Sequence, residues 1–355
     1  MLNAEAGILY DRDIARDYAE LLPFVFKRFS ILSAARTLLP TLWYCCRRPV
    51  LPPSDRPALF TMNIFPPMAL LWYHLARKYL GTDVDIVIFD CSGHLDPGRF
   101  PGARVQKFLN LYAATKSEEF LRSIARHRSI GWICDDDMFF VGTGAADVVT
   151  RELAEERTAS VSFRPRTWWT FDIDGKKIPP SSSYCIAFNR HILIERENLS
   201  LAPANGNTHP TVIGKPPKRY DTCDRANEIL LRKGYRCFIV PEEERGKYVA
   251  GFSGMSGAVM LLSYFRTVDE TLAYFAAPPE NAWRGSMLSG ALSALMAVHT
   301  IQELSGKIAG KPFPLPSLPP LLELEKIRQA HWQTISRKEH FESVWETSER
   351  LREAL

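Results

Sequence analysis

Three consecutive aspartates, Asp135, Asp136 and Asp137, directly follow a hydrophobic segment at 130–134. Adjacent carboxylates repel one another unless a cation or solvent neutralises them. Mg²⁺ and Mn²⁺ prefer such oxygen ligands and share their coordination shells with substrate phosphates. Side chains at i and i+2 of an extended segment point to the same side, so the spacing predicts that Asp135 and Asp137 converge on one ion. The alternative is a solvated acidic turn that caps the next helix.

The elements around the triplet alternate between strands and helices. Hydrophobic patterning predicts strands at 58–62, 85–90 and 130–134. It predicts helices from Pro66 to Leu80, near 103–112 and from Thr115 onward. This alternation is typical of an α/β fold with a Rossmann-like parallel or mixed sheet and flanking helices. Ligands of such sheets collect beyond the carboxyl ends of the strands, where the triplet is expected to lie.

The second half of the chain is a mixture of both kinds of element. We expect strands at 159–163, 168–171, 184–188 and 237–240, and helices at 221–233, 283–304 and 320–355. Proline-rich linkers at 51–57 and 311–320 separate groups of elements. The expected organisation is a helical N-terminal extension (1–56), a central α/β domain (57–277) and a helical C-terminal extension (278–355).

Composition excludes several classes of protein. The chain has 355 residues, of which 46% are hydrophobic and 24% charged, so it is neither wholly disordered nor a disulfide-rich miniprotein. The net charge of +4 is too small to predict a nucleic-acid partner. Seven cysteines without a CxxC pair favour reduced thiols, and no basic segment precedes an apolar stretch at the N-terminus. We therefore expect a cytoplasmic protein.

Two features of the sequence bear on membranes. Three windows without Asp, Glu, Lys or Arg, at 57–76, 248–265 and 285–302, contain prolines, glycines, serines or histidines and are expected to be buried elements rather than spans. Residues 21–54 contain no acid but five Lys or Arg among aromatic and aliphatic side chains. Residues 11–48 are expected to be helical, with breaks near Pro23 and Pro40. The basic and aromatic composition of 21–54 predicts either peripheral contact with the inner face of an anionic membrane or a helix pair that packs on the main domain.

Two strand ends carry a resemblance to a known family. The segment Trp132-Ile133-Cys134-Asp135-Asp136-Asp137 resembles the Asp-x-Asp motif of GT-A fold, family 2-like glycosyltransferases, which use nucleotide sugars. Residues 86–92 are similar to the second-strand ending of that family, and the likeness extends over about 57–265. The resemblance implies that Asp90 and Ser92 contact the base or ribose of the donor. It also implies that Asp135 and Asp136 contact the diphosphate, and that Asp135 and Asp137 hold Mn²⁺ or Mg²⁺.

A further part of the resemblance lies at 219–236. In the family, an acid that heads a helix ending in Gly-Tyr faces the acceptor and serves as general base. The resemblance places Asp221 in that role, with Asp224 as the alternative. An aspartate there is also a good helix N-cap, and the two roles are compatible. Tyr184, in a strand before the acceptor region, and Trp168 with Trp169 are expected to contact the acceptor, although large aromatic side chains are more often core residues.

The sequence departs from the family pattern after the last strand of the domain. Many relatives have a histidine there as a third metal or diphosphate ligand, whereas residues 247–254 contain none. Lys247, or the backbone N–H groups of the glycine-rich stretch, is expected to contact the diphosphate instead. His209, in a polar loop, is a substitute candidate.

The predicted function is transfer of a sugar from a nucleoside-diphosphate sugar to a hydroxyl of a glycan or lipid, with inversion and with a divalent metal. Such a hexosyltransferase activity belongs to polysaccharide or glycolipid biosynthesis. One alternative is a nucleotidyltransferase that makes the activated sugar, although the loop at 61–67 has no glycine to cradle phosphates. The other is a non-catalytic scaffold on a membrane surface.

Overall fold

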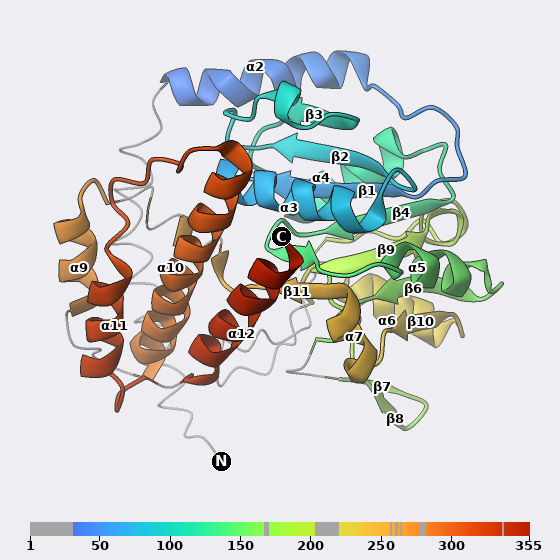
Figure 1. Cartoon of the computed structure of the whole chain (residues 1–355). Coiled ribbons are helices and arrows are strands. Elements are labelled where there is room, and N and C mark those ends of the chain that lie inside the picture. The colour runs from blue at the N-terminus through green and yellow to red at the C-terminus, as the bar shows by residue number, and fades with distance from the viewer. Residues whose placement is uncertain are drawn as a thin grey trace.

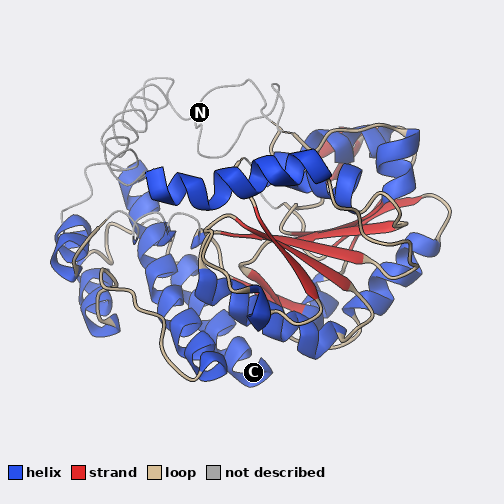
Figure 2. Cartoon of the chain, turned by 90° about the horizontal axis from the view of Figure 1, so that it is seen from above, coloured by secondary structure: helices blue, strands red, loops and turns tan. Residues whose placement is uncertain are grey.

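A computed structural model describes the chain at residues 31–111, 113–166, 170–202, 220–255, 258–259, 262, 265–276, 282–335 and 337–355, without the side chains of 31–35 and 282–288. Its centre is a seven-stranded sheet in the order β10-β6-β9-β4-β1-β2-β3. These strands are β1 (Ala58–Asn63), β2 (Asp85–Asp90), β3 (Ala103–Lys107), β4 (Ile130–Cys134), β6 (Thr158–Ser162), β9 (Cys185–Asn189) and β10 (Arg236–Ile239). Only β9 runs antiparallel to its neighbours in this sheet, β4 and β6. The predicted α/β fold with flanking helices is confirmed, and the sheet is mixed (Figure 2).

Helices cover both faces of the sheet because alternate strand side chains point to opposite sides. On one face, Trp132 of β4 stacks on Phe163 within a hydrophobic cluster. That cluster includes α3 (Pro66–Leu80), α5 (Ala145–Ala154), α10 (Ala282–Ala309), α11 (Leu321–Ala330) and α12 (Glu339–Ala354). On the other face, Phe60 of β1 stacks on Phe120. This second cluster includes α2 (Ile31–Arg47), α4 (Ala113–Glu119), the π-helical turns 120–124 and 191–196, and α6 (Asp224–Arg232).

Smaller elements complete the fold. A two-stranded sheet joins β5 (Met138–Phe140), which follows the triplet, to β11 (Val249–Gly251). A hairpin consists of β7 (Phe171–Ile173) and β8 (Lys176–Ile178). The short helices are the 3₁₀ turn Pro97–Arg99, α7 (Glu242–Tyr248) and α9 (Val268–Ala276).

Three predicted elements differ in the structure. Residues 103–107 form the edge strand β3 instead of a helix, because they pair in parallel with Ile86–Asp90 of β2. The helix α2 continues through Pro40, and packing of this helix on β3 holds it where proline removes one backbone hydrogen bond. The predicted helix at 320–355 is two helices, α11 and α12, that pack separately on α10. The part of the predicted N-terminal helices before residue 31 lies outside the described residues.

Two of the three windows without charged residues lie within the folded body, as expected. Residues 57–76 include β1 and most of α3, and 285–302 lie in α10, which packs between α3 and α12 (Figure 1). Within the described part of the chain, no helix has the length and apolar character needed to cross a bilayer. The helices α10 and α12 share the hydrophobic cluster of α3, so the C-terminal helices belong to the same core as the sheet.

Candidate functional site

The site lies where β1, β2 and β4 end side by side. In the parallel register Asn63, the last residue of β1, pairs with Asp90, the last residue of β2, and both are fully buried. The triplet follows β4 on the other side of β1. The Asn63 Nδ2 group donates hydrogen bonds to Asp136 Oδ2 (2.5 Å) and to the backbone oxygen of Phe65 (2.9 Å). Asn63 therefore connects the ends of two strands, and sequence reasoning missed this contact.

The triplet itself forms a turn between β4 and β5. Asp135 N–H donates to the backbone oxygen of Tyr184 (2.8 Å), and the N–H of Met138 donates back to the Asp135 oxygen (3.1 Å). The Asp137 oxygen accepts from the N–H of Phe252 (2.9 Å), just beyond β11. These backbone contacts fix the turn from three directions and leave the three half-buried carboxylates for other partners.

Two oxygens of this cluster are suited to a divalent cation. Asp137 Oδ1 and Asn63 Oδ1 are buried and have no hydrogen-bond partner within the part of the chain that the structure describes. An unpaired buried oxygen is costly unless a ligand satisfies it, and carboxylate and amide oxygens suit Mg²⁺ and Mn²⁺. No group of three or more His, Cys, Asp or Glu side chains in the described ranges is arranged to hold a metal by itself. The residues therefore fit an ion held by one or two carboxylates whose shell is completed by substrate phosphates.

Burial and mutual repulsion dominate the electrostatics of the triplet. Burial raises the pKa of Asp135 and of Asp136 well above the ordinary value, and the charges of neighbouring aspartates raise them further. Lys116 opposes both shifts. Burial raises the pKa of Asp137 to about 7, although the guanidinium of Arg164 lowers it. Binding of a cation stabilises such a cluster, because the cation offsets the repulsion between the carboxylates.

Sequence reasoning missed the two cations beside the triplet. Lys116 is almost fully buried, and its Nζ donates to Asn110 Oδ1 (3.0 Å). In the sequence it looks like one of several exposed charges on an amphipathic helix. Arg164 lies over the ring of Tyr184, with 5.1 Å from Cζ to the ring centroid. Arg164 follows β6, which pairs in parallel with β10. Ligands gather beyond the carboxyl ends of such strands, so its position in the sequence could have predicted a place in the site.

We expect the metal-free Asp137→Asn variant to gain stability over the wild type as the pH rises. An acid whose pKa is about 7 in the fold and about 4 in the unfolded chain costs nothing below pH 4 and destabilises the fold fully above pH 7. In EDTA, the melting temperature of the variant should therefore move progressively above that of the wild type between about pH 4 and pH 7. A difference that stays constant across this range would contradict the assigned shift.

Asp90 holds a loop rather than pointing into open space. Its Oδ1 accepts hydrogen bonds from the backbone N–H groups of Ser92 (3.0 Å) and Gly93 (2.8 Å) and from Ser92 Oγ (2.6 Å). Its Oδ2 accepts from the N–H of Leu95 (3.0 Å). With four hydrogen bonds and full burial, Asp90 orders the loop after β2. The predicted contact of Asp90 and Ser92 with the donor stays a prediction.

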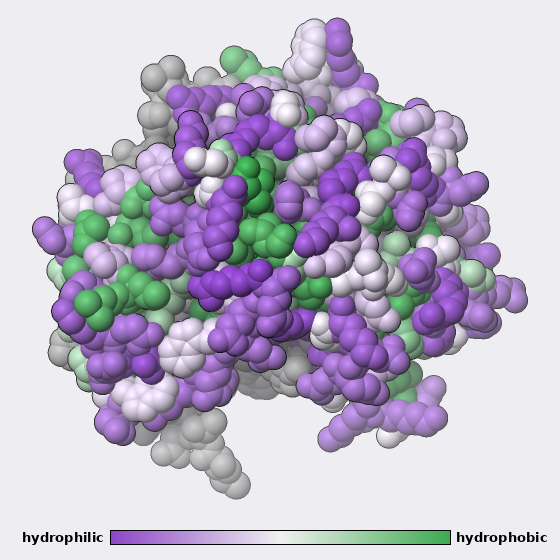
Figure 3. Space-filling model, viewed as in Figure 1, coloured by the Kyte–Doolittle hydropathy of each residue, from purple (hydrophilic) through white to green (hydrophobic). Residues whose placement is uncertain are grey.

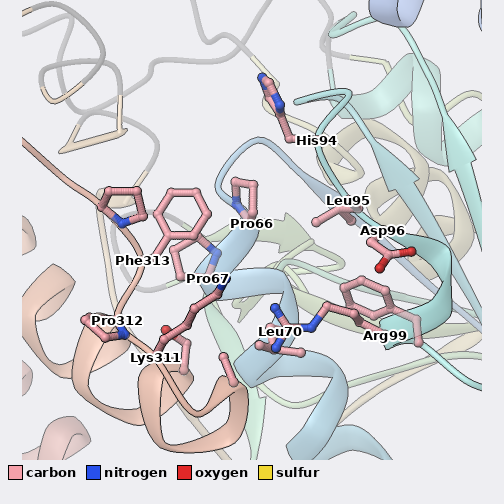
Figure 4. Close-up of a pocket in the computed structure, with 14 residues that line it drawn as sticks. Pro66, Pro67, Leu70, His94, Leu95, Asp96, Arg99, Lys311, Pro312 and Phe313 are labelled. Atoms are coloured by element: carbon pink, nitrogen blue, oxygen red, sulfur yellow. The ribbon is translucent and has the colours of Figure 1, made fainter.

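This loop lines a cavity of about 270 Å³ at the carboxyl ends of β1 and β2. Pro66 and Leu70 of α3 form one wall, and the stretch from His94 to Phe100 forms another. Lys311 to Pro314, from the linker after α10, close a third side. Figure 4 shows Phe313 beside Pro66 and Arg99 on the side of the loop after β2. Sequence reasoning assigned no role to this linker.

The start of α6 contains the two candidate bases. Arg166, almost fully buried, donates through Nη1 to Asp221 Oδ2 (3.0 Å) and through Nε to Asp224 Oδ1 (2.9 Å). The N–H of Asp221 donates to Asp224 Oδ2 (2.9 Å), so Asp224 caps the turn that leads into the helix. The Asp224 side chain is fully buried and the Asp221 side chain is 30% exposed. Burial raises the pKa of Asp224 to about 6 despite Arg166.

The structure brings the start of α6 towards the triplet. The charge of Asp135 contributes to the raised pKa of the buried Cys223, the residue directly before α6, although burial is the main cause. Asp137 and Asp135 likewise contribute to the raised pKa of Tyr184, after burial. The charges of the triplet therefore act on Tyr184 and on the residue before α6, while the predicted roles of these residues in one site stay predictions.

The structure places Lys247 away from the triplet. Lys247 is exposed, near the end of α7. Along the chain it lies before β11, whereas Phe252, after β11, is the residue bonded to Asp137. Because an extended strand advances about 3.3 Å per residue, the length of β11 separates Lys247 from the triplet. Trp168, Trp169 and His209 lie outside the described residues, so their expected contacts stay predictions.

Comparisons with known proteins identify no family for this chain. No protein-family model matches, and no curated protein matches. Solved structures that resemble it include the mannosyltransferase PcManGT from Pyrobaculum calidifontis in complex with GDP-Man and Mn²⁺, at 16% identity and a TM-score of 0.36 over 91% of this chain and 95% of that one. Another is the bifunctional glycosyltransferase WbbM, at 12% identity and a TM-score of 0.32 over 55% of this chain and 40% of that one. Neither likeness carries the functional assignment, which rests on the residues of the site.

Proposed function

We propose that this protein is a glycosyltransferase that moves a sugar from a nucleoside-diphosphate sugar to an acceptor hydroxyl. The observation that carries the proposal is the carboxylate cluster at the end of β4, where Asp137 Oδ1 is buried without a partner among the described residues and the charges of Lys116 and Arg164 act on the carboxylates. A site that combines carboxylates with a buried lysine and a half-buried arginine suits a diphosphate bridged to a divalent ion. The resemblance to the Asp-x-Asp motif of the GT-A fold supports this assignment.

The proposed donor site extends from the cavity to the triplet. The nucleoside occupies the cavity between Pro66, Arg99 and Phe313, and Asp90 acts by ordering the loop that forms its wall. Asp135 and Asp137 hold Mn²⁺ or Mg²⁺, which stabilises the charge of the leaving diphosphate. The cations of the site, Lys116 and Arg164, lower the repulsion between that diphosphate and the carboxylates.

The proposed acceptor site lies between the triplet and α6. Asp221 accepts the proton of the acceptor hydroxyl as the oxygen attacks the anomeric carbon, and the bond from that carbon to the diphosphate breaks. Attack from the side opposite the leaving group inverts the configuration. Tyr184, with Trp168 and Trp169, supplies an apolar surface for a glycan or lipid acceptor. Arg166 holds Asp221 in place through the hydrogen bond between Nη1 and Oδ2.

The decisive experiment is slow hydrolysis of a panel of nucleotide sugars. The purified full chain is incubated with each donor and Mn²⁺ or Mg²⁺, and release of the nucleoside diphosphate is measured. We expect release from one base and sugar combination, lost in EDTA, and a melting temperature raised by the same diphosphate with metal. Pyrophosphate release from a nucleoside triphosphate and a sugar phosphate would instead establish the nucleotidyltransferase. If no nucleotide or nucleotide sugar binds, the non-catalytic scaffold is the remaining interpretation.

A further inference from the structure

Over 36–47, where its side chains are described, α2 turns hydroxyl-bearing residues inward and apolar residues outward. The residues buried against the body are Thr37, Thr41 and Tyr44, spaced as one helical face. The exposed residues on the other side are Leu38, Leu39, Leu42 and Trp43. A surface helix of a globular protein normally shows the opposite arrangement, with its apolar stripe towards the core.

Specific hydrogen bonds hold the polar side in place. Thr41 Oγ1 donates to the Thr37 backbone oxygen (2.7 Å) and accepts from the N–H of Leu109 (2.7 Å). The Tyr44 hydroxyl donates to Glu119 Oε1 (2.9 Å), and its ring packs edge-on against Phe108, with 5.4 Å between centroids. Rotation of α2 would break these contacts, so the apolar side faces outward as a consequence of how the helix is anchored.

The outward side is large enough to bind something. Leu39, Leu42 and Trp43 are 63%, 54% and 60% exposed, and they lie at i, i+3 and i+4 on one stripe. The exposed Cys46 continues the stripe at i+7. Figure 3 shows apolar atoms at the upper edge of the molecule, where α2 runs in Figure 1. Single exposed apolar residues need no explanation, but a continuous stripe indicates an interaction site.

The charges around the stripe select the partner. No acid occurs between residues 21 and 54, whereas Arg36, Arg47 and Arg48 lie in or beside α2 and are exposed. The guanidinium of Arg47 lies over the ring of Trp43, with 4.1 Å between Cζ and the centroid. A tryptophan at the boundary of apolar and basic surface is typical of helices that lie in the headgroup region of anionic lipids.

We infer that the outward side of α2 (Leu38, Leu39, Leu42 and Trp43) inserts into the surface of an anionic membrane, and that Arg36, Arg47 and Arg48 contact its headgroups. The placement also concerns the site, because Arg36 Nη1 donates to His94 Nε2 (2.9 Å) and His94 lines the cavity at the ends of β1 and β2. Docking through α2 therefore sets that cavity beside the lipid. The inference rests on α2 alone and does not require the proposed activity.

The chain offers a matched control surface. Leu321, Leu322 and Trp345 on the C-terminal helices are also exposed, at 45%, 67% and 42%. Acids adjoin these side chains in sequence, Glu323 and Glu346, in contrast to the acid-free sequence around α2, although the guanidinium of Arg328 lies over the ring of Trp345, with 5.0 Å between Cζ and the centroid. Two exposed leucines and one exposed tryptophan can thus be replaced by glutamine on α2 or on the C-terminal helices.

The test is flotation of the full chain with vesicles of phosphatidylglycerol and phosphatidylcholine, beside vesicles of phosphatidylcholine alone. We expect the wild type to float with the anionic vesicles and to be released by salt. Leu39→Gln, Leu42→Gln, Trp43→Gln together should lower the bound fraction by about tenfold or more. Arg47→Gln with Arg48→Gln should have a similar effect on anionic vesicles. The control triple Leu321→Gln, Leu322→Gln, Trp345→Gln should float like the wild type.

A second measurement reports directly on α2. Cys45 and Cys46 are exposed, whereas Cys91, Cys134, Cys185 and Cys223 are buried. Anionic vesicles should therefore slow the reaction of the exposed pair with a water-soluble maleimide, and phosphatidylcholine vesicles should not. Failure of the wild type to float at low salt would overturn the inference. So would a stable dimer in solution that the α2 triple variant abolishes, because a second copy would then be the occupant of the stripe.

Discussion

The Asp135→Asn and Asp137→Asn variants should each lose sugar transfer by about 10²–10³-fold or more while folding normally. Each substitution keeps the size of the side chain and removes a charge that stabilises the ion at the leaving diphosphate. The structure also predicts the direction in which the stability of these variants changes. Because burial raises the pKa values of both carboxyls, and repulsion from the neighbouring aspartates raises that of Asp135 further, removal of one charge should leave the metal-free melting temperature unchanged or higher at neutral pH.

The matched control is Glu243→Gln, which removes one carboxylate from the exposed side of α7. It should transfer sugar at the wild-type rate and show the same rise in melting temperature with Mn²⁺ and nucleoside diphosphate. The two aspartate variants should lose most of that rise. Wild-type turnover in both variants would show that the triplet is a turn and not a metal site.

The second large effect is expected for Asp221→Asn, which should lower turnover by about 10²–10⁴-fold, the usual contribution of a positioned general base. The amide keeps an oxygen that accepts from Arg166 Nη1 and loses the basicity. Asp221 is the acid of the pair that an acceptor can reach, since its side chain is 30% exposed and that of Asp224 is fully buried. Turnover and donor affinity are measured together, and donor affinity should change little.

Asp224→Asn separates the two acids. Asp224 accepts from Arg166 Nε and from the N–H of Asp221 deep under the helix start. We expect this variant to lose stability, by about 1.5–3 kcal/mol for a hydrogen bond between charged groups, and to keep turnover near the wild type once folded. A stable and inactive Asp224→Asn beside an active Asp221→Asn would assign the base to the other acid. Full turnover in both would exclude a base in this segment.

The strands that carry the triplet were predictable because they are buried on both faces. β1, β2 and β4 appear in the sequence as short, nearly continuous hydrophobic runs, and a polar residue ends each run or directly follows it. β3 was not predictable in this way. Its sequence, Ala-Arg-Val-Gln-Lys, has no residue that is fully buried, and it is a strand only because β2 offers an unpaired edge.

The partners of the carboxylates could not be predicted from the sequence, because tertiary packing brings them to the site. Lys116 is a long way from Asp135 along the chain, and nothing in Ala-Ala-Thr-Lys-Ser distinguishes a buried lysine from an exposed one. Asn63 could have been found, since it ends the strand that pairs with β2. The linker residues Lys311 and Phe313 reach the cavity only because α10 packs on α3 and returns the chain to the strand ends.

The antiparallel strand in the middle of the sheet has a consequence for the chain during its synthesis. β1 to β4 can pair as soon as Cys134 has emerged, but the free edge of β4 waits for β9, which begins about fifty residues later. At roughly 5–20 residues per second the ribosome needs about 3–10 s to supply that strand. During this time β6 has no partner and β4 presents an open hydrophobic edge, which is a template for pairing with another chain. Nascent chains that stall between residues 134 and 185 should therefore be the aggregation-prone species of this protein.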